Sequence, residues 1–361
     1  MITITLCMIV KNEEDTLDRC LQSICDIVDE IIVVDTGSTD RTKEVASKWT
    51  PHVFDFTWIH DFAAARNFSF SKATMDYILW LDADDVLLPE NIQKLTNLKQ
   101  LMSPKLDAVS MLYNCDFDDQ GNVTLNVRRN RLVKREKNYQ WKGVVHEDLE
   151  VKDGTFYDSD TVVTHRKNHG SSDPDRNLKI YKSLVATGKE FTPRDTLHYA
   201  MELHQHRSYQ KAIELYLQFM DMEEISAEDR IYCCSKLADC YHFIEDRKKE
   251  REFIFKSMEY DTPRPEFCCR LGYYFLEKNQ FSQASFWYKI ATELPVPKNL
   301  WAIQNHVSHT WLPHMQLGLC YYQMEEYELS YYHNNIALSY RPDDQSIINN
   351  MKLVEEIINK K

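Results

Sequence analysis

Short apolar runs recur through the first half of the chain, and each run is followed by a stretch with helical spacing. The runs Ile2–Val10, Ile31–Val34 and Tyr77–Leu81 place apolar residues on consecutive positions, which is typical of strands buried on both faces of a sheet. Another short strand is expected near residues 52–56, ahead of a helix over 58–73. This alternation of strands and helices predicts a mostly parallel, doubly wound α/β sheet.

Acidic residues close two of these strands. Asp35 follows the second run, and Asp82, Asp84 and Asp85 follow the fourth. The carboxyl ends of parallel strands meet at one rim of an open sheet, where ligands bind. Asp82 and Asp84 would point to the same side of an extended chain and could share one divalent cation, Mg²⁺ or Mn²⁺. The alternative is an acidic turn in which Asp85 caps the helix that begins within residues 87–95.

Residues 107–165 alternate short β-like runs with turns, and we expect them to extend the sheet on the acceptor side. Two groups of polar residues stand out here: His146, Glu147 and Asp148 together, then His165 and His169. A carboxylate of the first group could act as a base. A later histidine could ligate a metal or a phosphate, although His146 in a loop and His169 on the surface also fit purely structural roles.

Helical spacing replaces strand patterns from about residue 178 onward. Small residues recur at intervals of 38, 34 and 46 positions, at Ala200, Ala238, Gly272 and Gly318. Because the tetratricopeptide period is about 34 residues, this half resembles that family of helical repeats. We therefore predict two domains, one over residues 1–177 and a helical repeat over 178–361 that binds a peptide or pairs subunits.

Overall composition narrows the possible partners. The net charge of −13 in 361 residues argues against a nucleic-acid surface, which needs clustered lysine and arginine. The first apolar run is too short for a membrane span or a secretion signal. Ten cysteines scattered through apolar segments are typical of reduced thiols, so we expect a soluble, cytoplasmic protein.

Three motifs, MIVKNEED, IIVVDTGSTDRT and FAAARNFSFSKATMDYILWLDADD, resemble in order and spacing the family 2 glycosyltransferases of the GT-A fold. The resemblance covers roughly residues 3–90. It implies that Asp35 contacts uracil, that Arg66 lies near the nucleotide, and that Asp82 and Asp84 bind the metal. The nucleotide-sugar site it implies consists of Val10, Asn12, Glu13, Asp35, Ser38, Arg66, Asp82 and Ala83. The family often has a second acid where this chain has Thr36.

A narrower resemblance, to the bacteriocin peptide S-glycosyltransferases of the sublancin type, rests on the middle segment. The residues GVVHED at 143–148 and a strand ending in His165 recur there in this order. The resemblance implies His165 as a third metal ligand and a base that is Glu147 or Asp148, with Glu147 favoured because the His-Glu pair is what matches. The subgroup has Asn-Gly-Tyr after the histidine, whereas this chain has Arg-Lys-Asn.

Together these features predict a metal-dependent, inverting glycosyltransferase. It would move a hexose from UDP-glucose or UDP-N-acetylglucosamine to a cysteine thiol or a serine or threonine hydroxyl of a peptide, as a possible homodimer. One alternative is a haloacid-dehalogenase-like phosphatase with Asp82 as nucleophile and Asp84 as acid. That family usually carries its motif on the first strand, whereas about 80 residues precede it here. Another alternative is an inactive adaptor that works through its repeats.

Overall fold

The computed structural model describes residues 1–166, 173–295 and 301–360. His169, and the Lys and Asn that follow Arg166, lie outside these residues. The chain forms two compact units: the first contains Met1–Asp116 and Asn126–His198, and the second contains Phe117–Leu125 and Tyr199–Lys361. A domain boundary after residue 177 stays a prediction; it falls inside the helix α5 (Arg176–Ala186) of the first unit.

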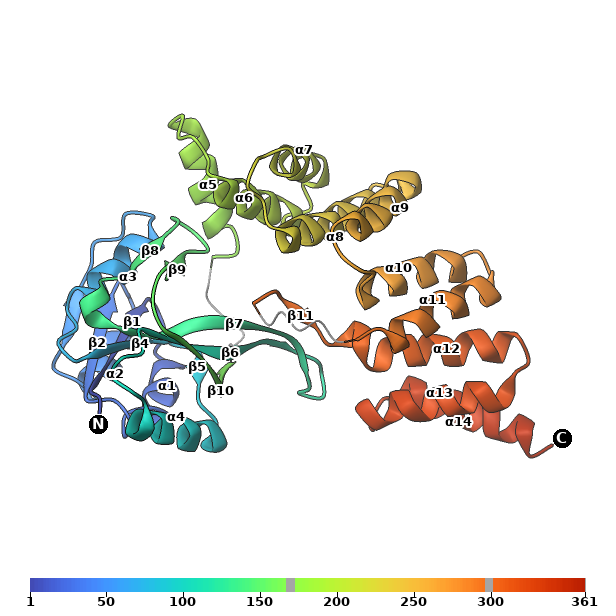
Figure 1. Cartoon of the computed structure of the whole chain (residues 1–361), viewed down its shortest axis with the longest axis horizontal. Helices are drawn as coiled ribbons and strands as arrows, with labels where there is room; N and C mark the ends of the chain where they lie inside the picture. The colour runs from blue at the N-terminus through green and yellow to red at the C-terminus, as the bar shows by residue number, and fades with distance from the viewer. Residues whose placement is uncertain (167–172, 296–300, 361) are drawn as a thin grey trace. The chain divides into compact units, whose positions relative to one another are not determined.

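A sheet forms the centre of the first unit (Figure 1), with strands in the order β3-β2-β1-β4-β7-β6-β10-β5. The predicted parallel core is present, because β1 pairs in parallel with β2 and β4, and β2 pairs in parallel with β3. The middle segment extends this sheet as predicted, with β7 antiparallel to β4 and β5 antiparallel to β10. The strands are β1 Ile4–Val10, β2 Glu30–Asp35, β3 Val53–Asp55, β4 Tyr77–Trp80, β5 Asp85–Val86, β6 Ala108–Phe117, β7 Val123–Lys134 and β10 Phe156–His165.

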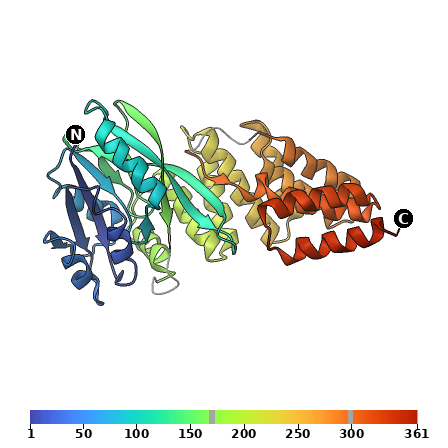
Figure 2. The ribbon, with the colours of Figure 1, turned by 90° about the horizontal axis from the view of Figure 1, so that it is seen from below.

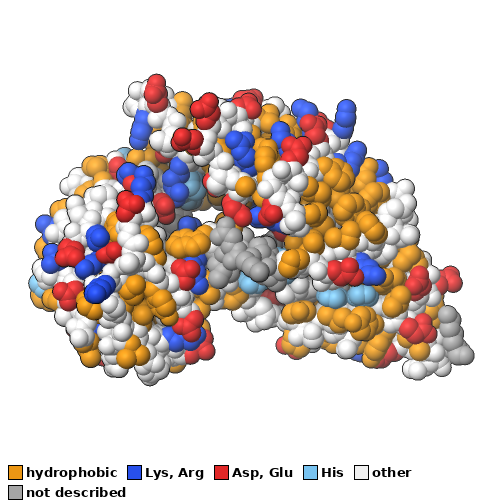
Figure 3. Space-filling model, viewed as in Figure 1, with side chains coloured by type: hydrophobic (Ala, Val, Ile, Leu, Met, Phe, Trp, Pro, Cys, Tyr) orange, Lys and Arg blue, Asp and Glu red, His pale blue; other side chains and the backbone are white. Residues whose placement is uncertain are grey.

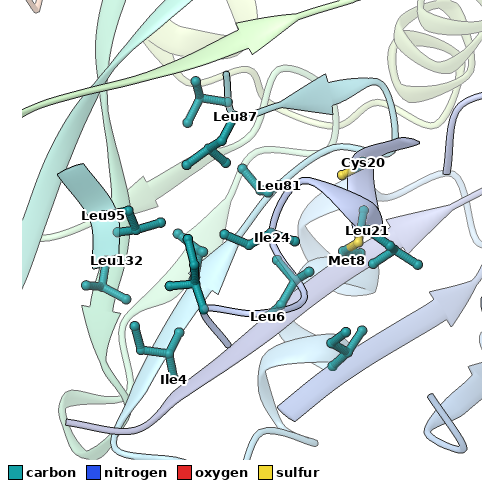
Figure 4. Packing of buried hydrophobic residues seen from close by; sticks show 14 of the residues in the cluster. Ile4, Leu6, Met8, Cys20, Leu21, Ile24, Leu81, Leu87, Leu95 and Leu132 are labelled. Carbon is teal, nitrogen blue, oxygen red and sulfur yellow. The ribbon is translucent and has the colours of Figure 1, made fainter. Parts of the chain in front are cut away.

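Both faces of this sheet are buried, which explains the uninterrupted apolar runs. Leu6 and Met8 of β1 pack on one face with residues of α1 (Leu17–Gln22), α2 (Thr42–Ser47) and α4 (Pro89–Leu101) (Figure 4). Cys7 points to the opposite face, which is covered by α3 (Phe62–Phe70) and the hairpin of β8 (Gln140–Lys142) and β9 (Asp148–Glu150). In Figure 2, which views the molecule from below, α4 lies in front of the sheet. Alternate residues of a strand therefore supply two separate cores.

The segment that follows β4 does not have the structure expected if Asp85 capped the next helix. α4 begins at Pro89, with Leu88 in the N-cap position. Asp85 instead lies in the short strand β5, where it pairs with His165 of β10. The prediction that Asp85 caps the following helix is therefore wrong, and this residue belongs to the sheet rim.

The second unit is a stack of antiparallel helices, as the sequence predicts; Figure 2 shows its last three helices side by side. Gly272 lies against the ring of Tyr288, which a Cβ at this glycine would approach to 2.7 Å. A Cβ at Gly318 would come closer still to the side chain of Asn334. The small residues therefore permit close helix packing. The helices are α6 Pro193–Gln205, in which the first unit passes into the second, α7 Tyr209–Met220, α8 Ala227–Phe243, α9 Arg247–Lys256, α10 Pro265–Leu276, α11 Phe281–Glu293, α12 Trp311–Gln323, α13 Tyr327–Tyr340 and α14 Gln345–Ile358.

The tip of the β6–β7 hairpin, Phe117–Leu125, belongs to this second unit. Arg341, which follows α13, forms ion pairs with Asp118 at 3.5 Å and with Asp119 at 2.7 Å. The carbonyl of Thr124 accepts a hydrogen bond of 2.9 Å from the backbone N–H of His306. This insertion from the first half of the sequence was not predicted.

Hydrophobic side chains also reach the surface of the repeat (Figure 3). The exposed hydrophobic residues of α8, α9 and α10 are Phe243, Phe255 and Tyr273. Among the helices that the structure describes, none has both the length and the apolar character needed to cross a bilayer. All ten cysteines are free thiols, in agreement with the sequence-based expectation.

Candidate active site

Two carboxylates and one imidazole meet at the rim of the first unit. The turn after β4 leads into β5, and the antiparallel pairing of β5 with β10 places His165 beside Asp85. His165 Nδ1 lies 3.5 Å from Asp84 Oδ1 and 3.7 Å from Asp85 Oδ1, and the ligand atoms of these three residues all lie within 4.8 Å of one another. Asp84 and Asp85 raise the pKa of His165 to about 10, against the effect of burial. This donor set suits a divalent cation.

The buried Asp85 is balanced by an equally buried arginine. Arg131 Nη1 lies 3.0 Å from Asp85 Oδ2, and both side chains are 0% exposed. The guanidinium stacks on Trp80, 3.8 Å from the ring centroid, and on Tyr113 at 4.5 Å. Within the described part of the chain, Asp85 Oδ1 accepts no hydrogen bond. This second oxygen is therefore available to a cation, and the three residues fit a metal site.

Asp82 pairs with an arginine, whereas Asp84 lies beside His165. Its Oδ1 accepts a hydrogen bond of 2.7 Å from Arg66 Nη2. Burial raises the pKa of Asp82, but the charges of Arg66 and Arg131 outweigh this effect and hold the pKa below its usual value. The structure thus brings Asp84 and His165 together, adds Asp85 to them, and places Asp82 against an arginine. Ala83, between the two acids, is buried.

Arg66 connects Asp82 to the segment that carries the expected base. It lies on α3, whose first turn is capped by Asp61. Its guanidinium lies against the rings of Trp80 and Trp141, 5.0 and 4.7 Å from their centroids, and the two rings also contact each other edge to face. Its Nε donates a hydrogen bond of 2.5 Å to Glu147 Oε1. Burial lowers the pKa of Arg66, but its two acidic partners outweigh this and raise it, so the guanidinium stays charged.

The two candidate bases therefore have different surroundings. The Glu147 side chain is 10% exposed and is held by Arg66. Asp148 is the first residue of β9 and is exposed. The preceding His146 has a φ of 54°, and its carbonyl accepts hydrogen bonds from Arg194, the shorter of 2.7 Å. The backbone turn at His146 thus directs two adjacent carboxylates into two environments.

The predicted nucleotide-binding residues form a second part of the same rim. The buried Asp35 ends β2, and its Oδ1 accepts hydrogen bonds of 2.9 Å from the backbone N–H groups of Gly37 and Ser38. Ser38 Oγ in turn accepts a hydrogen bond of 2.9 Å from the backbone N–H of Asn12. Among the described residues, Asp35 Oδ2 has no hydrogen-bond partner. It is therefore available to an N–H donor of a ligand.

The loop after β1 completes this part of the rim. The Val10 carbonyl accepts a hydrogen bond of 2.9 Å from the backbone N–H of Thr36. Burial raises the pKa of Glu13, and the nearby charges of Asp84 and Asp82 act in the same direction. The carboxylate of Glu13 therefore lies close enough to the acidic turn to respond to its charge.

Arg131 and Tyr113 were not predicted as site residues, yet Arg131 pairs with Asp85 and the Tyr113 hydroxyl lies 3.1 Å from His165 Nδ1. Arg131 lies within the run NVRRNRLV, where alternation along a strand puts Arg129 and Arg131 on one face and Arg128 on the other. Three arginines in this run leave the choice open without the strand register.

Residues 5–148 match the model of Glycosyl transferase family 2. The chain carries a family 2 glycosyltransferase domain. This assignment replaces the phosphatase alternative, and it agrees with the motif order from which the fold was predicted. In the first unit, the Asp-Ala-Asp turn follows β4, within the residues that the family model covers.

One relative matches most of the chain, and another matches less than half of it. A TPR repeat-containing protein of Synechococcus elongatus is 29% identical over 327 residues, which cover 89% of this chain and 74% of that protein. The glycosyltransferase SunS of Bacillus subtilis is 31% identical over 150 residues, which cover 40% of this chain and 34% of SunS. The family 2 domain is thus followed by tetratricopeptide-like repeats.

Among solved structures, glucosyl-3-phosphoglycerate synthase of Mycobacterium tuberculosis, in complex with Mn²⁺ and UDP-glucose, aligns with a TM-score of 0.35 and 16% identity. The alignment covers 53% of this chain and 81% of that enzyme.

Proposed function

We propose that this protein is a metal-dependent, inverting glycosyltransferase that moves a hexose from a UDP-sugar to a side chain of a peptide or protein. The observation that carries the proposal is the group Asp84, Asp85 and His165 at the rim of a family 2 domain. The donor sugar would be glucose or N-acetylglucosamine, as in the sequence-based expectation.

The rim provides separate places for the cation and for the nucleotide. Asp84, Asp85 and His165 would hold Mn²⁺ or Mg²⁺, which as a Lewis acid stabilises the negative charge of a departing diphosphate. Asp35 would accept a hydrogen bond from the uracil N–H through its unpartnered Oδ2. Val10, Asn12, Glu13 and Ser38 line the same rim and would surround the nucleoside, while Arg66, Asp82 and Ala83 would lie at the diphosphate.

The transfer itself requires little covalent chemistry from the protein. The sulfur or oxygen of the acceptor forms a bond to C1 of the sugar while the bond from C1 to the phosphate oxygen breaks. The bonding electron pair leaves with UDP, and the proton of the acceptor goes to a carboxylate, Glu147 or Asp148. A cysteine thiol, with a usual pKa near 8.5, places a smaller demand on this base than a hydroxyl does.

The tetratricopeptide-like repeats would hold the peptide acceptor or pair two copies of the chain. Solenoids of this kind bind extended segments along one face, and the repeat exposes aromatic side chains such as Phe243 and Tyr273. Light scattering of the whole protein tests for pairing of two copies, and calorimetric titration with a peptide acceptor tests for peptide binding.

Thermal unfolding with UDP, UDP-glucose and UDP-N-acetylglucosamine, each with and without Mn²⁺, tests the donor site. A ligand that binds the native state at a hundred times its Kd stabilises it by about 2.7 kcal/mol. We expect such a shift with a UDP-sugar only when the metal is present. Transfer is then measured by mass spectrometry of cysteine and serine peptides.

Asp84→Ala should abolish the metal-dependent part of this shift, because it removes one ligand of the cation. Asp160→Ala is the matched control: this acid lies in β10 of the same sheet, and its side chain is 78% exposed. A wild-type protein whose melting temperature responds to no uridine nucleotide in the presence of Mn²⁺ would rule out the proposed function.

A further inference from the structure

Glu147 contacts a buried arginine, and this contact conflicts with its expected role as base. Arg66 is 8% exposed and uses two donors on two acids, Nε on Glu147 at 2.5 Å and Nη2 on Asp82 at 2.7 Å. Hydrogen bonds between ionised groups are roughly twice as strong as neutral ones. One oxygen of Glu147 is therefore committed to Arg66 before any acceptor arrives.

The backbone that carries Glu147 is fixed to the same helix as Arg66. The side chain of Asn67, the next residue of α3, donates a hydrogen bond of 3.0 Å to the carbonyl of Trp141 and accepts one of 2.8 Å from its N–H. The N–H of Phe62, at the start of α3, donates one of 3.0 Å to the carbonyl of Val144. These three bonds set the distance between α3 and the strand segment, so that Glu147 meets Arg66.

The aromatic rings restrict the Arg66 guanidinium to its position beside Glu147 and Asp82. Trp80 and Trp141 each place a ring within 5.0 Å of its central carbon, and an arginine on an aromatic face gains stacking as well as charge stabilisation. Lysine has no planar fork and could not hold two carboxylates in this geometry. The arrangement is suited to presenting one fixed positive charge.

We infer that Glu147 is a positioning residue, which together with Asp82 holds Arg66 in place for the donor diphosphate, and that the acceptor proton goes to the exposed Asp148. The inference rests on the proposed function and assigns different tasks to the two carboxylates that follow His146. It also separates the two acids of the Asp-Ala-Asp turn: Asp84 contributes to the metal site, and Asp82 holds the arginine.

A double-mutant cycle on the full-length protein tests the inference. Calorimetry gives the Kd for UDP with Mn²⁺, and a transfer assay gives kcat and KM for the UDP-sugar. We expect Glu147→Gln to weaken UDP binding about tenfold, the usual effect of losing a charged hydrogen bond. Arg66→Gln should do the same, and the double variant should bind no more than about twofold more weakly than Arg66→Gln, because coupled residues are not additive.

Asp148→Asn should instead affect the chemical step: we expect kcat to fall about a hundredfold or more and the Kd for UDP to stay unchanged. Glu150→Gln is the matched control, because Glu150 lies in the same hairpin and pairs only with the exposed Lys152 and Lys142 among the described residues. This control should leave both quantities as they are in the wild type.

A Glu147→Gln protein with wild-type affinity for UDP and a much lower kcat would identify Glu147 as the base and overturn the inference, while the proposed function would stand. Wild-type protein that binds no UDP would instead overturn the proposed function. Should Glu147→Gln fail to fold, Glu147→Asp provides the measurement: it keeps the charge but shortens the side chain, and it should raise the Kd for UDP without lowering kcat.

Discussion

Replacing Arg131 with methionine should strongly destabilise the glycosyltransferase domain. Both Arg131 and Asp85 are fully buried and lie 3.0 Å apart. Methionine fills much of the space that Arg131 occupies against the rings of Trp80 and Tyr113, but it leaves the Asp85 carboxylate buried without a cation. Removing one partner of a buried ion pair costs about 3–5 kcal/mol, which is a large fraction of the 5–15 kcal/mol that is typical of a domain.

Urea unfolding in the presence of a chelator, followed by tryptophan fluorescence, measures this loss. The double variant Arg131→Met with Asp85→Leu removes both charges, and it should recover most of the stability because apolar residues can replace a buried pair at little cost. Mn²⁺ should stabilise the single variant more than the double variant, which retains no carboxylate at position 85. A loss below about 1 kcal/mol in the single variant, or a double variant that is no more stable than the single one, would refute this reasoning.

Three further predictions concern other parts of the molecule. Gly272→Ala should cost about 1–3 kcal/mol of repeat stability in thermal unfolding, because the added methyl group overlaps the ring of Tyr288. Burial and His314 lower the pKa of His333 to about 4, so the stability that the neutral imidazole contributes is complete above pH 6.5 and is lost as the pH falls towards 4; His333→Phe should remove this loss from the pH profile of unfolding. Asp35→Ala should weaken UDP binding about tenfold by calorimetry with Mn²⁺ present, because it removes a buried acceptor of the proposed nucleotide site.

The parts of the fold that depend on local pattern could be predicted from the sequence. Consecutive apolar residues identified the strands of the parallel core because both faces of that sheet are covered. Small residues such as Gly272 marked the repeat because paired helices approach most closely there. Asp84 and His165 were brought together by the resemblance to a family, since no local pattern relates two residues that far apart.

The partners of the charged residues could not be predicted in the same way. Arg131 reaches Asp85 because β7 pairs with β4 in a register that places Leu132 opposite Leu79. A shift of one residue would turn Arg131 to the other face of the sheet. Likewise, the His-Glu pair suggested a base at Glu147, but the contact with Arg66 joins residues 81 positions apart. Such contacts depend on strand register and on tertiary packing.

The hairpin tip at Phe117–Leu125 affects how the two units can be expressed separately. A truncation after His198 would keep the tip but discard Arg341 and the backbone N–H of His306. Asp118 and Asp119 would then be left as unbalanced negative charges at the end of a protruding ribbon. An isolated catalytic fragment should therefore be made with the tip shortened to a tight turn, and the repeats expressed by themselves would lack a strand that only the N-terminal half of the chain can supply.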